Sequence, residues 1–363
     1  MSVGNKKTNS LPSLSGRSFV GVDIGDHSIK MVQVSKRSAD SVQIENCAIT
    51  PLPAGVVVGG KLNNVDGLIS SIQQTVSRMG GVSKNVIFGV SDASATVQNF
   101  AYDASSGLDL EGAAEFEAAQ ISVIDDINFD YQAVGEVGRN GQNVLLAIAK
   151  KEDIEPFLGA LDETGLPPVL VDVEPVARIN AYSYWINQNA PELEKAVVAV
   201  FEVGEESTQA LVLQNGALLY KQNFSLGGKN FTRELQRASQ VSADEAEKMK
   251  ISANKSQEYQ QVAESFNSQL LQEIQRVLQF FYTVASAAQK VERIFLTGGG
   301  SQSAGVAEYS SEHAGVKTQL LHPANEVSLS GKVNQEQFKQ NAARYTVAFG
   351  LALRGLAWLN LLD

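Results

Sequence analysis

The chain has 363 residues, and 29 Lys and Arg stand against 40 Asp and Glu, which gives a formal net charge of −11. This acidic balance argues against a protein built mainly to neutralise nucleic-acid phosphates and against a polybasic membrane anchor. A single cysteine excludes an internal disulfide framework and a multi-cysteine zinc site, and three scattered histidines do not favour a histidine metal site. The composition, with 44% hydrophobic and 19% charged residues, is that of a globular protein, and the length predicts two or more folded domains. The single cysteine favours a reducing compartment.

The first 17 residues are rich in Ser, Asn, Gly and Pro and contain no long apolar run. They lack the apolar region of a signal peptide, and no other segment has the roughly 18 continuous apolar residues of a transmembrane helix. We therefore expect residues 1–17 to form a disordered tail and the protein to be cytoplasmic.

A repeated strand-turn-strand pattern organises the rest of the chain. Residues 19–34 read FVGVDIGDHSIKMVQV, and residues 198–213 read VAVFEVGEESTQALVL. A third apolar strand follows each copy, over residues 42–49 and 217–223, so the pattern predicts two duplicated α/β domains. The residues that align at one constant offset are Asp23 with Glu202, Gly25 with Gly204, and Ser28 with Ser207.

Each copy ends its first strand near an acidic residue and then turns at a glycine. A glycine lets a ligand approach the backbone closely, and successive N–H groups can point at phosphate oxygens. An acidic residue at the strand end can hold Mg²⁺ through water. Two such turns facing one another would bind a polyphosphate and its metal, whereas one turn taken alone is more often structural.

The second half adds a glycine pair before a helix and three glycines after a strand. The sequence LGGK opens a helix expected over residues 230–239, and apolar residues at helical spacing predict a long helix over 257–290. A strand at 293–296 runs into the glycines, whose bare backbone suits a flat base or a phosphate. These glycines are Gly298, Gly299 and Gly300.

Residues 91–168, between the first repeat and the middle of the chain, have the pattern of a small separate α/β unit. A GRNG tetrad between two apolar stretches predicts a hairpin, and a Gly followed by Pro-Pro ends the last helix. The predicted elements are a strand at 95–100, a helix at 108–120, paired strands at 129–137 and 143–149, and a helix at 152–164.

In this order the motifs resemble those of the actin-like ATPase superfamily and, within it, the PilM family of type IV pilus assembly proteins, which is similar to FtsA. The resemblance covers nearly the whole chain after Phe19. It implies an α/β fold of actin type, a ribonuclease H-like duplicated βββαβαβα arrangement in two domains, with an inserted FtsA-type 1C subdomain. The motifs that carry it are GVDIGDHSIK (21–30), DVEPVARINAY (172–182), FEVGEEST (201–208), SLGGKNFT (225–232), DEAEKMK (244–250) and LTGGGS (296–301).

The same resemblance implies how the chain divides after its tail. The implied parts are domain 1A at 18–90 and 169–195, the 1C insert at 91–168, domain 2A at 196–228 and 293–340, domain 2B at 229–292, and a C-terminal connecting helix at 341–363.

The resemblance implies a site for ATP and Mg²⁺. Asp23 and Glu202 would hold Mg²⁺ through water, and Glu174 lies where related enzymes position or activate a water. The residues implied to contact the nucleotide are Gly25, Asp26, His27, Ser28 and Lys30 at the first loop, Gly204, Glu205, Glu206 and Ser207 at the second, and Gly228, Glu247, Lys248 or Lys250, Gly298, Gly299 and Gly300 around the ribose and base.

Two positions depart from the family pattern. Glu202 stands where the family usually carries Asp, and Asp26 with His27 stands where small or hydroxyl residues are usual. The longer Glu202 side chain could displace the metal, and a carboxylate near a γ-phosphate costs Coulomb energy unless a cation screens it. We therefore expect ATP binding with at most slow hydrolysis.

The resemblance also implies a protein partner. In the PilM family the cleft between domains 1A and 1C receives the extended N-terminal cytoplasmic peptide of PilN, with an Asn-Leu-Leu-Pro core. We expect an adaptor recruited to the inner-membrane face through this partner, without nucleic acid. Residues 86–90 and 121–127 are either walls of that cleft or ordinary core. Pilus motor ATPases, the platform protein and a second copy of the chain are the further partners that the resemblance suggests.

Two other functions remain open at the level of sequence. An FtsA-like or bacterial-actin-like filament protein would share the fold and the loops. A sugar-kinase-like phosphotransferase would normally need a larger sugar-binding domain and a catalytic Asp near the second loop, where this chain offers only glutamates.

Overall fold

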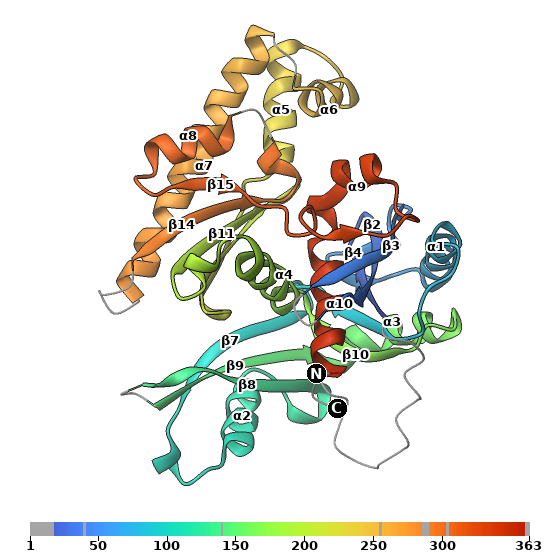
Figure 1. Ribbon diagram of the computed structural model, residues 1–363, viewed down its shortest axis with the longest axis vertical. Coiled ribbons are helices and arrows are strands. Elements are labelled where there is room, and N and C mark those ends of the chain that lie inside the picture. The colour runs from blue at the N-terminus through green and yellow to red at the C-terminus, as the bar shows by residue number, and fades with distance from the viewer. Residues whose placement is uncertain are drawn as a thin grey trace. The chain divides into compact units, whose positions relative to one another are not determined.

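The computed structural model describes residues 18–38, 41–138, 141–253, 256–284, 290–302 and 305–359 (Figure 1). The chain divides into unit 1, which runs to Trp185 and resumes at Pro323, and unit 2, which runs from Ile186 to His322. The division falls inside helix α4 (Glu174–Asn189). The predicted tail at 1–17 and the last residues of the predicted connecting helix, 360–363, lie outside the described residues.

Unit 1 is built on a six-stranded sheet with the order β10-β6-β1-β2-β3-β16. Strand β1 pairs with β2 in antiparallel fashion and with β6 in parallel fashion. The strands are β1 (Ser18–Ile24), β2 (Ser28–Lys36), β3 (Val42–Pro51), β6 (Val86–Val90), β10 (Pro168–Val173) and β16 (Ser328–Leu329).

Helices cover both faces of this sheet, so alternate residues of β1 belong to two cores. Phe19 packs with α4 and α10 (Thr346–Leu359), whereas Val20 packs with α1 (Val65–Arg78) and α3 (Lys151–Glu163). All five residues of β6 are buried, as expected for a parallel strand that is covered on both faces.

Unit 2 carries a five-stranded sheet with the order β13-β12-β11-β14-β15. Its helices share the core of that sheet, with α7 supplying the longest apolar face. The elements are β11 (Val197–Val203), β12 (Thr208–Gln214), β13 (Ala217–Phe224), α5 (Gly228–Ser239), α6 (Ala243–Ile251), α7 (Gln257–Val284), β14 (Val291–Thr297), α8 (Val306–His313) and β15 (Thr318–Leu320).

The two sheets confirm the predicted duplication. Read from its β15 edge, the sheet of unit 2 repeats the order and the strand directions of β10-β6-β1-β2-β3 in unit 1. The long helix of unit 2 is described only to Val284, and residues 285–289 lie outside the described ranges. Lys290, predicted as its last residue, precedes β14 without helical structure.

Between β6 and β10 the chain forms a three-stranded sheet with the order β7-β9-β8 and helix α2 against it (Figure 1). This confirms the predicted strands, hairpin and first helix of the insert, and β8 and β9 extend further toward the turn than predicted. The predicted second helix also forms, as α3, but it packs in the core of the six-stranded sheet and not on the sheet of the insert. The elements are β7 (Ala95–Tyr102), α2 (Leu110–Ala119), β8 (Ile127–Gly138) and β9 (Gly141–Lys150).

Short elements complete the fold. Among the described helices, none combines the length and the apolar character needed to cross a lipid bilayer. The remaining elements are β4 (Val57–Val58), β5 (Lys61–Leu62), α9 (Gln335–Asn341) and 3₁₀ turns at Ala104–Ser106, Ile124–Asp126, Pro191–Leu193, Gly299–Gln302 and Ala342–Tyr345.

Helix α10 approaches its neighbours through glycines. A Cβ built on Gly21 of β1 would lie 1.9 Å from the Ala348 carbonyl oxygen of α10. A Cβ on Gly350 would lie 1.8 Å from the Ala177 carbonyl oxygen of α4. These positions therefore accept no side chain unless the backbones separate.

We predict that Gly350→Ala destabilises unit 1 by about 1–3 kcal/mol, because the new methyl group overpacks the contact between α10 and α4. Thermal unfolding followed by circular dichroism measures the effect. The control is Gly159→Ala in α3, where a Cβ would meet no atom within 4 Å and a helical alanine gains about 0.5–1 kcal/mol. Equal midpoints for the two variants would contradict the proposed contact.

Candidate functional site

The two repeated turns have the same backbone geometry. The Gly25 N–H donates to the Ser28 carbonyl oxygen at 3.2 Å, and the Gly204 N–H donates to the Ser207 carbonyl oxygen at 2.9 Å. Each bond closes the hairpin between the first two strands of its unit. Arg344 Nη2 lies 3.5 Å from Ser28 Oγ, and the Ser28 side chain is buried.

The first turn has its own cation. Asp23 lies opposite Lys30 in the β1–β2 ladder, and Lys30 Nζ is 3.2 Å from Asp23 Oδ2. The same ammonium group is 3.2 Å from the point where a Cβ on Gly25 would stand. The equivalent position in unit 2 pairs Glu202 with the neutral Gln209. The two turns are therefore alike in backbone and different in charge.

The Asp26 carboxylate is engaged by backbone donors of its own unit. Its oxygens accept from the N–H groups of Gly59 at 2.7 Å and Gly60 at 3.0 Å, in the β4–β5 turn. Two such bonds stabilise the ionised carboxylate. His27 is exposed, and its carbonyl oxygen accepts from the Leu52 N–H at 2.9 Å.

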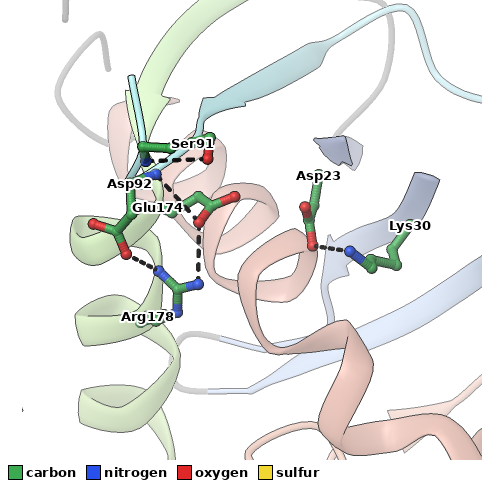
Figure 2. Close-up of polar contacts among 7 residues, drawn as sticks. Asp23, Lys30, Ser91, Asp92, Glu174 and Arg178 are labelled. Carbon is green, nitrogen blue, oxygen red and sulfur yellow. Dashed lines mark hydrogen bonds and ion pairs between the residues drawn. The ribbon is translucent and has the colours of Figure 1, made fainter. Parts of the chain in front are cut away.

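Glu174, the first residue of α4, belongs to a buried polar cluster (Figure 2). Arg178, one turn later, donates from Nη2 to Glu174 Oε2 at 3.1 Å and from Nη1 to Asp92 Oδ2 at 2.8 Å. The Asp92 N–H lies 3.5 Å from the same Glu174 oxygen. One guanidinium group thus joins the two carboxylates.

Burial raises the pKa of Glu174 to about 7, and the charges of Asp23 and Asp92 add to the rise, whereas Arg178 and Lys30 oppose it. The cluster holds three carboxyl groups and two cations. With all three carboxyl groups ionised, the cluster would carry one excess negative charge. Protonation of one carboxyl group removes that excess, which agrees with the raised pKa of Glu174.

In unit 2 the second turn packs on a glycine pair. A Cβ on Gly227 would lie 2.4 Å from the Glu205 carbonyl oxygen, and the Gly228 N–H donates to the Gly204 carbonyl oxygen at 2.9 Å. The pair therefore joins the turn to the beginning of α5.

The side chains of Glu205, Glu206 and Ser207 are exposed on this turn. Glu206 forms an ion pair with Lys229, whose N–H donates to the Glu205 carbonyl oxygen at 2.8 Å. The turn is thus held by backbone bonds and one surface ion pair.

Helix α6 contributes Glu247 and Lys250 to the same place. Lys250 Nζ is 2.6 Å from Glu247 Oε2, 2.9 Å from Thr232 Oγ1 and 3.3 Å from the Gly228 carbonyl oxygen. Thr232 Oγ1 also lies 2.6 Å from Glu247 Oε2, as donor. Lys248 is exposed, and Lys250 is the lysine of this motif that contacts Glu247, Thr232 and Gly228.

The three glycines after β14 adjoin the second turn. A Cβ on Gly298 would lie 2.5 Å from the Val203 carbonyl oxygen, and one on Gly300 would lie 3.2 Å from the Gly204 carbonyl oxygen. A Cβ on Gly299 would meet nothing within 4 Å, so one side of this backbone is open.

The residues of unit 2 therefore fit a nucleotide. They combine turn N–H groups, an open glycine backbone and a paired Lys and Glu, which are groups that bind phosphate, base and ribose. Across the described ranges, no three Asp, Glu, His or Cys side chains gather as a metal site. Mg²⁺ would then be held mainly by water and by phosphate oxygens, which it accepts readily.

Three participants were not predicted. Arg178 lies four residues after Glu174, so helical periodicity within the DVEPVARINAY motif could have revealed it. Thr232 lies inside the SLGGKNFT motif. Asp92 is 82 residues from Glu174 along the chain, and no sequence pattern connects them.

The structure decides between wall and core for one of the two segments. Residues 86–90 form β6 and are wholly buried, so they are core and cannot be a peptide-binding wall. Residues 121–127 are mixed, because Ile121 and Val123 are exposed whereas Ile127 is buried.

Comparison with known proteins agrees with this architecture. A sequence model of the family described as type IV pilus assembly protein PilM matches residues 21–356. A chain from a PilM-PilN type IV pilus biogenesis complex is 25% identical with a TM-score of 0.75, covering 93% of this chain and 98% of that one.

Two other solved structures show the fold alone. The ethanolamine utilization protein EutJ from Carboxydothermus hydrogenoformans is 16% identical with a TM-score of 0.54, over 94% of this chain and 92% of that chain. MreB 5 of Spiroplasma citri bound to AMPPNP is 11% identical with a TM-score of 0.54, over 96% of this chain and 98% of that chain. The fold is actin-like, and because the family match spans nearly the whole sequence, the chain belongs to the PilM family of type IV pilus assembly proteins.

Proposed function

We propose that this protein is an ATP-binding adaptor of type IV pilus assembly. In this role it binds the N-terminal cytoplasmic peptide of PilN between its first domain and the inserted unit. It thereby links the inner-membrane alignment complex to the cytoplasmic pilus machinery and is recruited to the membrane through that partner. The observation that carries the proposal is the likeness, over nearly both whole chains, to a PilM chain solved in complex with PilN.

The nucleotide part of the proposal is supported by the groups around the second turn. Gly228, Glu247 and Lys250 with Gly298–Gly300 would bind the base and ribose, and the turn N–H groups would bind phosphate. The first turn, with Lys30, is proposed as a further phosphate contact. Asp23 and Glu202 are proposed as water-mediated partners of Mg²⁺, and Glu174 as the residue that positions a water.

An adaptor also needs a route from the nucleotide to the inserted unit. Unit 1 offers one, because Ser94, at the start of that unit, donates to the Gly60 carbonyl oxygen at 3.1 Å. Gly60 in turn donates to Asp26 of the first turn, and Asp92 contacts Glu174. The residues that lead into β7 are therefore linked to two proposed nucleotide-site residues, directly to Glu174 through Asp92 and indirectly to Asp26 through Gly60.

We predict saturable binding of a fluorescent PilN N-terminal peptide, measured by anisotropy, with a Kd that changes when Mg-ATP is present. Linkage requires the peptide to change the Kd of ATP by the same factor. The control peptide has serines in place of the two leucines of the Asn-Leu-Leu-Pro core. Absence of peptide binding with and without nucleotide would refute the adaptor role, and filament assembly would then be measured by sedimentation.

Lys250→Ala is expected to weaken binding of a fluorescent ATP analogue by about tenfold or more, because the variant loses a cation and three polar contacts at the start of α5. Lys248→Ala, two residues away and exposed, is the matched control and should stay within about twofold. The peptide Kd without nucleotide reports whether the variant is folded. Equal ATP affinity of both variants would remove Lys250 from the site.

For Glu174→Gln, we expect a stability difference that depends on pH. The pKa of about 7 in the native state exceeds the usual value of about 4.3, so the native state binds the proton more tightly than the unfolded state. The stability contributed by protonated Glu174 is then complete below about pH 4 and is lost as the pH rises to 7. Because Gln mimics the protonated form, the variant should gain thermal stability relative to the parent between pH 5 and pH 8. A difference independent of pH would disprove the raised pKa.

A further inference from the structure

Helix α2 of the inserted unit is apolar on two sides. Its inner side carries Ala114 and Ala118, which are fully buried against the three-stranded sheet (Figure 1). Phe116 lies between them in sequence, about 200° from Ala114 at 100° per residue, and is 60% exposed. The helix therefore presents a large aromatic ring on the side opposite its packed face.

Other exposed apolar side chains lie near this ring in the sequence. Leu108 and Gly112 precede Phe116 at intervals of four residues, and the point where a Cβ on Gly112 would stand is 3.8 Å from Leu108 Cδ2. Leu108 is 46% exposed, and after the helix Ile121 and Val123 are 42% and 65% exposed. Four of the eleven large hydrophobic side chains exposed in the described ranges thus fall within 16 consecutive residues. Such clusters mark interaction surfaces more often than scattered exposed residues do.

We name Leu108, Gly112, Phe116, Ile121 and Val123 the α2 face. Gly112 carries no side chain, and the point where its Cβ would stand is 3.1 Å from Oδ1 of the helix-capping residue Asp109.

The sequence around the α2 face is acidic, and one cation lies close by: Lys151 Nζ donates to the carbonyl oxygen of Asp125, two residues after Val123, at 2.6 Å. Between residues 92 and 138 the sequence contains no Lys, Arg or His and ten acidic residues. Glu111 and Glu115, on α2 itself, are exposed. On the neighbouring strand the pKa of Tyr131 is raised, first by desolvation and then by Glu111, Asp109 and Asp130. The ten residues are Asp92, Asp103, Asp109, Glu111, Glu115, Glu117, Asp125, Asp126, Asp130 and Glu136.

The acidic residues restrict which kinds of partner could bind the α2 face. An anionic lipid surface and nucleic-acid phosphates would be repelled by the acidic rim. Symmetric pairing of two copies would place two acidic rims against each other. A peptide segment with apolar side chains on one side and Lys or Arg beside them would satisfy both the apolar residues and the charge.

We propose that the α2 face is a docking surface for a basic, amphipathic segment of a partner protein. Leu108 and Phe116 would contact the apolar side chains of that segment, at a spacing that suits a helix. Glu111 and Glu115 would contact its basic side chains, steer its approach and favour it over acidic competitors. This surface does not depend on the nucleotide site, and it shares Ile121 and Val123 with the segment 121–127 that the sequence offers as a wall of the PilN cleft.

The probe for this proposal is a fluorescent helical peptide of about 18 residues, with Leu along one side and Lys elsewhere, titrated into the full-length protein. Two further peptides control for composition: one carries Glu in place of every Lys, and one scrambles the sequence so that its apolar periodicity is lost. We expect saturable binding of the first peptide only, with a Kd that rises as salt is added.

Variants locate the binding. Phe116→Ser should raise the Kd of the basic peptide by about tenfold or more. The control is Phe280→Ser, at an exposed phenylalanine on α7, which should leave this Kd unchanged. Glu111→Gln combined with Glu115→Gln should flatten the salt dependence, and Glu258→Gln combined with Glu264→Gln on α7 should not. Unchanged thermal midpoints show that the variants are folded. Equal binding by Phe116→Ser and the parent would overturn the proposal.

Further experiments test whether a membrane, a second copy of the chain or the chain's own tail occupies the α2 face instead. Phe116-dependent binding to anionic vesicles would overturn the proposal in favour of a membrane, and Phe116-dependent dimerisation in sedimentation would overturn it in favour of a second copy. The chain's own residues 1–17 carry Lys6, Lys7 and Arg17 and are tested as a synthetic peptide. If this peptide bound the α2 face more tightly than the designed probe, the occupant would be the chain's own tail and the proposal of a partner protein would be overturned. Displacement of the designed probe by the PilN peptide would show that the two surfaces are one.

Discussion

The close backbone approach of α10 to β1 and α4 is the constraint on which the rest of unit 1 depends. Gly21 and Gly350 remove the two side chains that would hold these elements apart. Helix α4 therefore begins beside the end of β1, and Glu174 enters the field of Asp23. The glycines of β1 and α10 are more than 300 residues apart in the chain, so unit 1 is complete only when the last helix has returned to the first strand.

That packing removes three carboxyl groups from water, and the two cations of the cluster around Glu174 compensate only part of their charge. Taking carboxylates out of water is costly unless cations and hydrogen bonds replace the solvent. Lys30 compensates Asp23, and Arg178 lies between Glu174 and Asp92. Because Glu174 is buried and one negative charge remains in excess around it, its pKa rises to about 7. A residue with this property can respond to small changes of charge nearby, such as the arrival of a phosphate group or a metal ion.

The inserted unit has a different physical character from the sheets that flank it. Its core is small and depends on alanines of α2 against three strands, and its surface combines exposed apolar side chains with acidic ones. Through Asp92 it is also hydrogen-bonded to Glu174, and through Ser94 it contacts Gly60, which donates to Asp26. The exposed apolar and acidic side chains of this unit are available to partners, which is consistent with the proposed adaptor.

The sequence by itself determined the duplicated sheets, the two glycine turns and the inserted unit, because hydrophobic periodicity and turn glycines are local signals. It also named the residues that gather around the second turn, where contiguous motifs return to the same place. Only the tertiary structure decided which groups the carboxylates of these motifs contact. Asp26 bonds to a turn 33 residues away, Glu174 meets Asp92, and Lys250 rather than Lys248 contacts Glu247. Such pairings depend on long-range packing and on which side of a helix faces inward, and neither is encoded in the spacing of a motif.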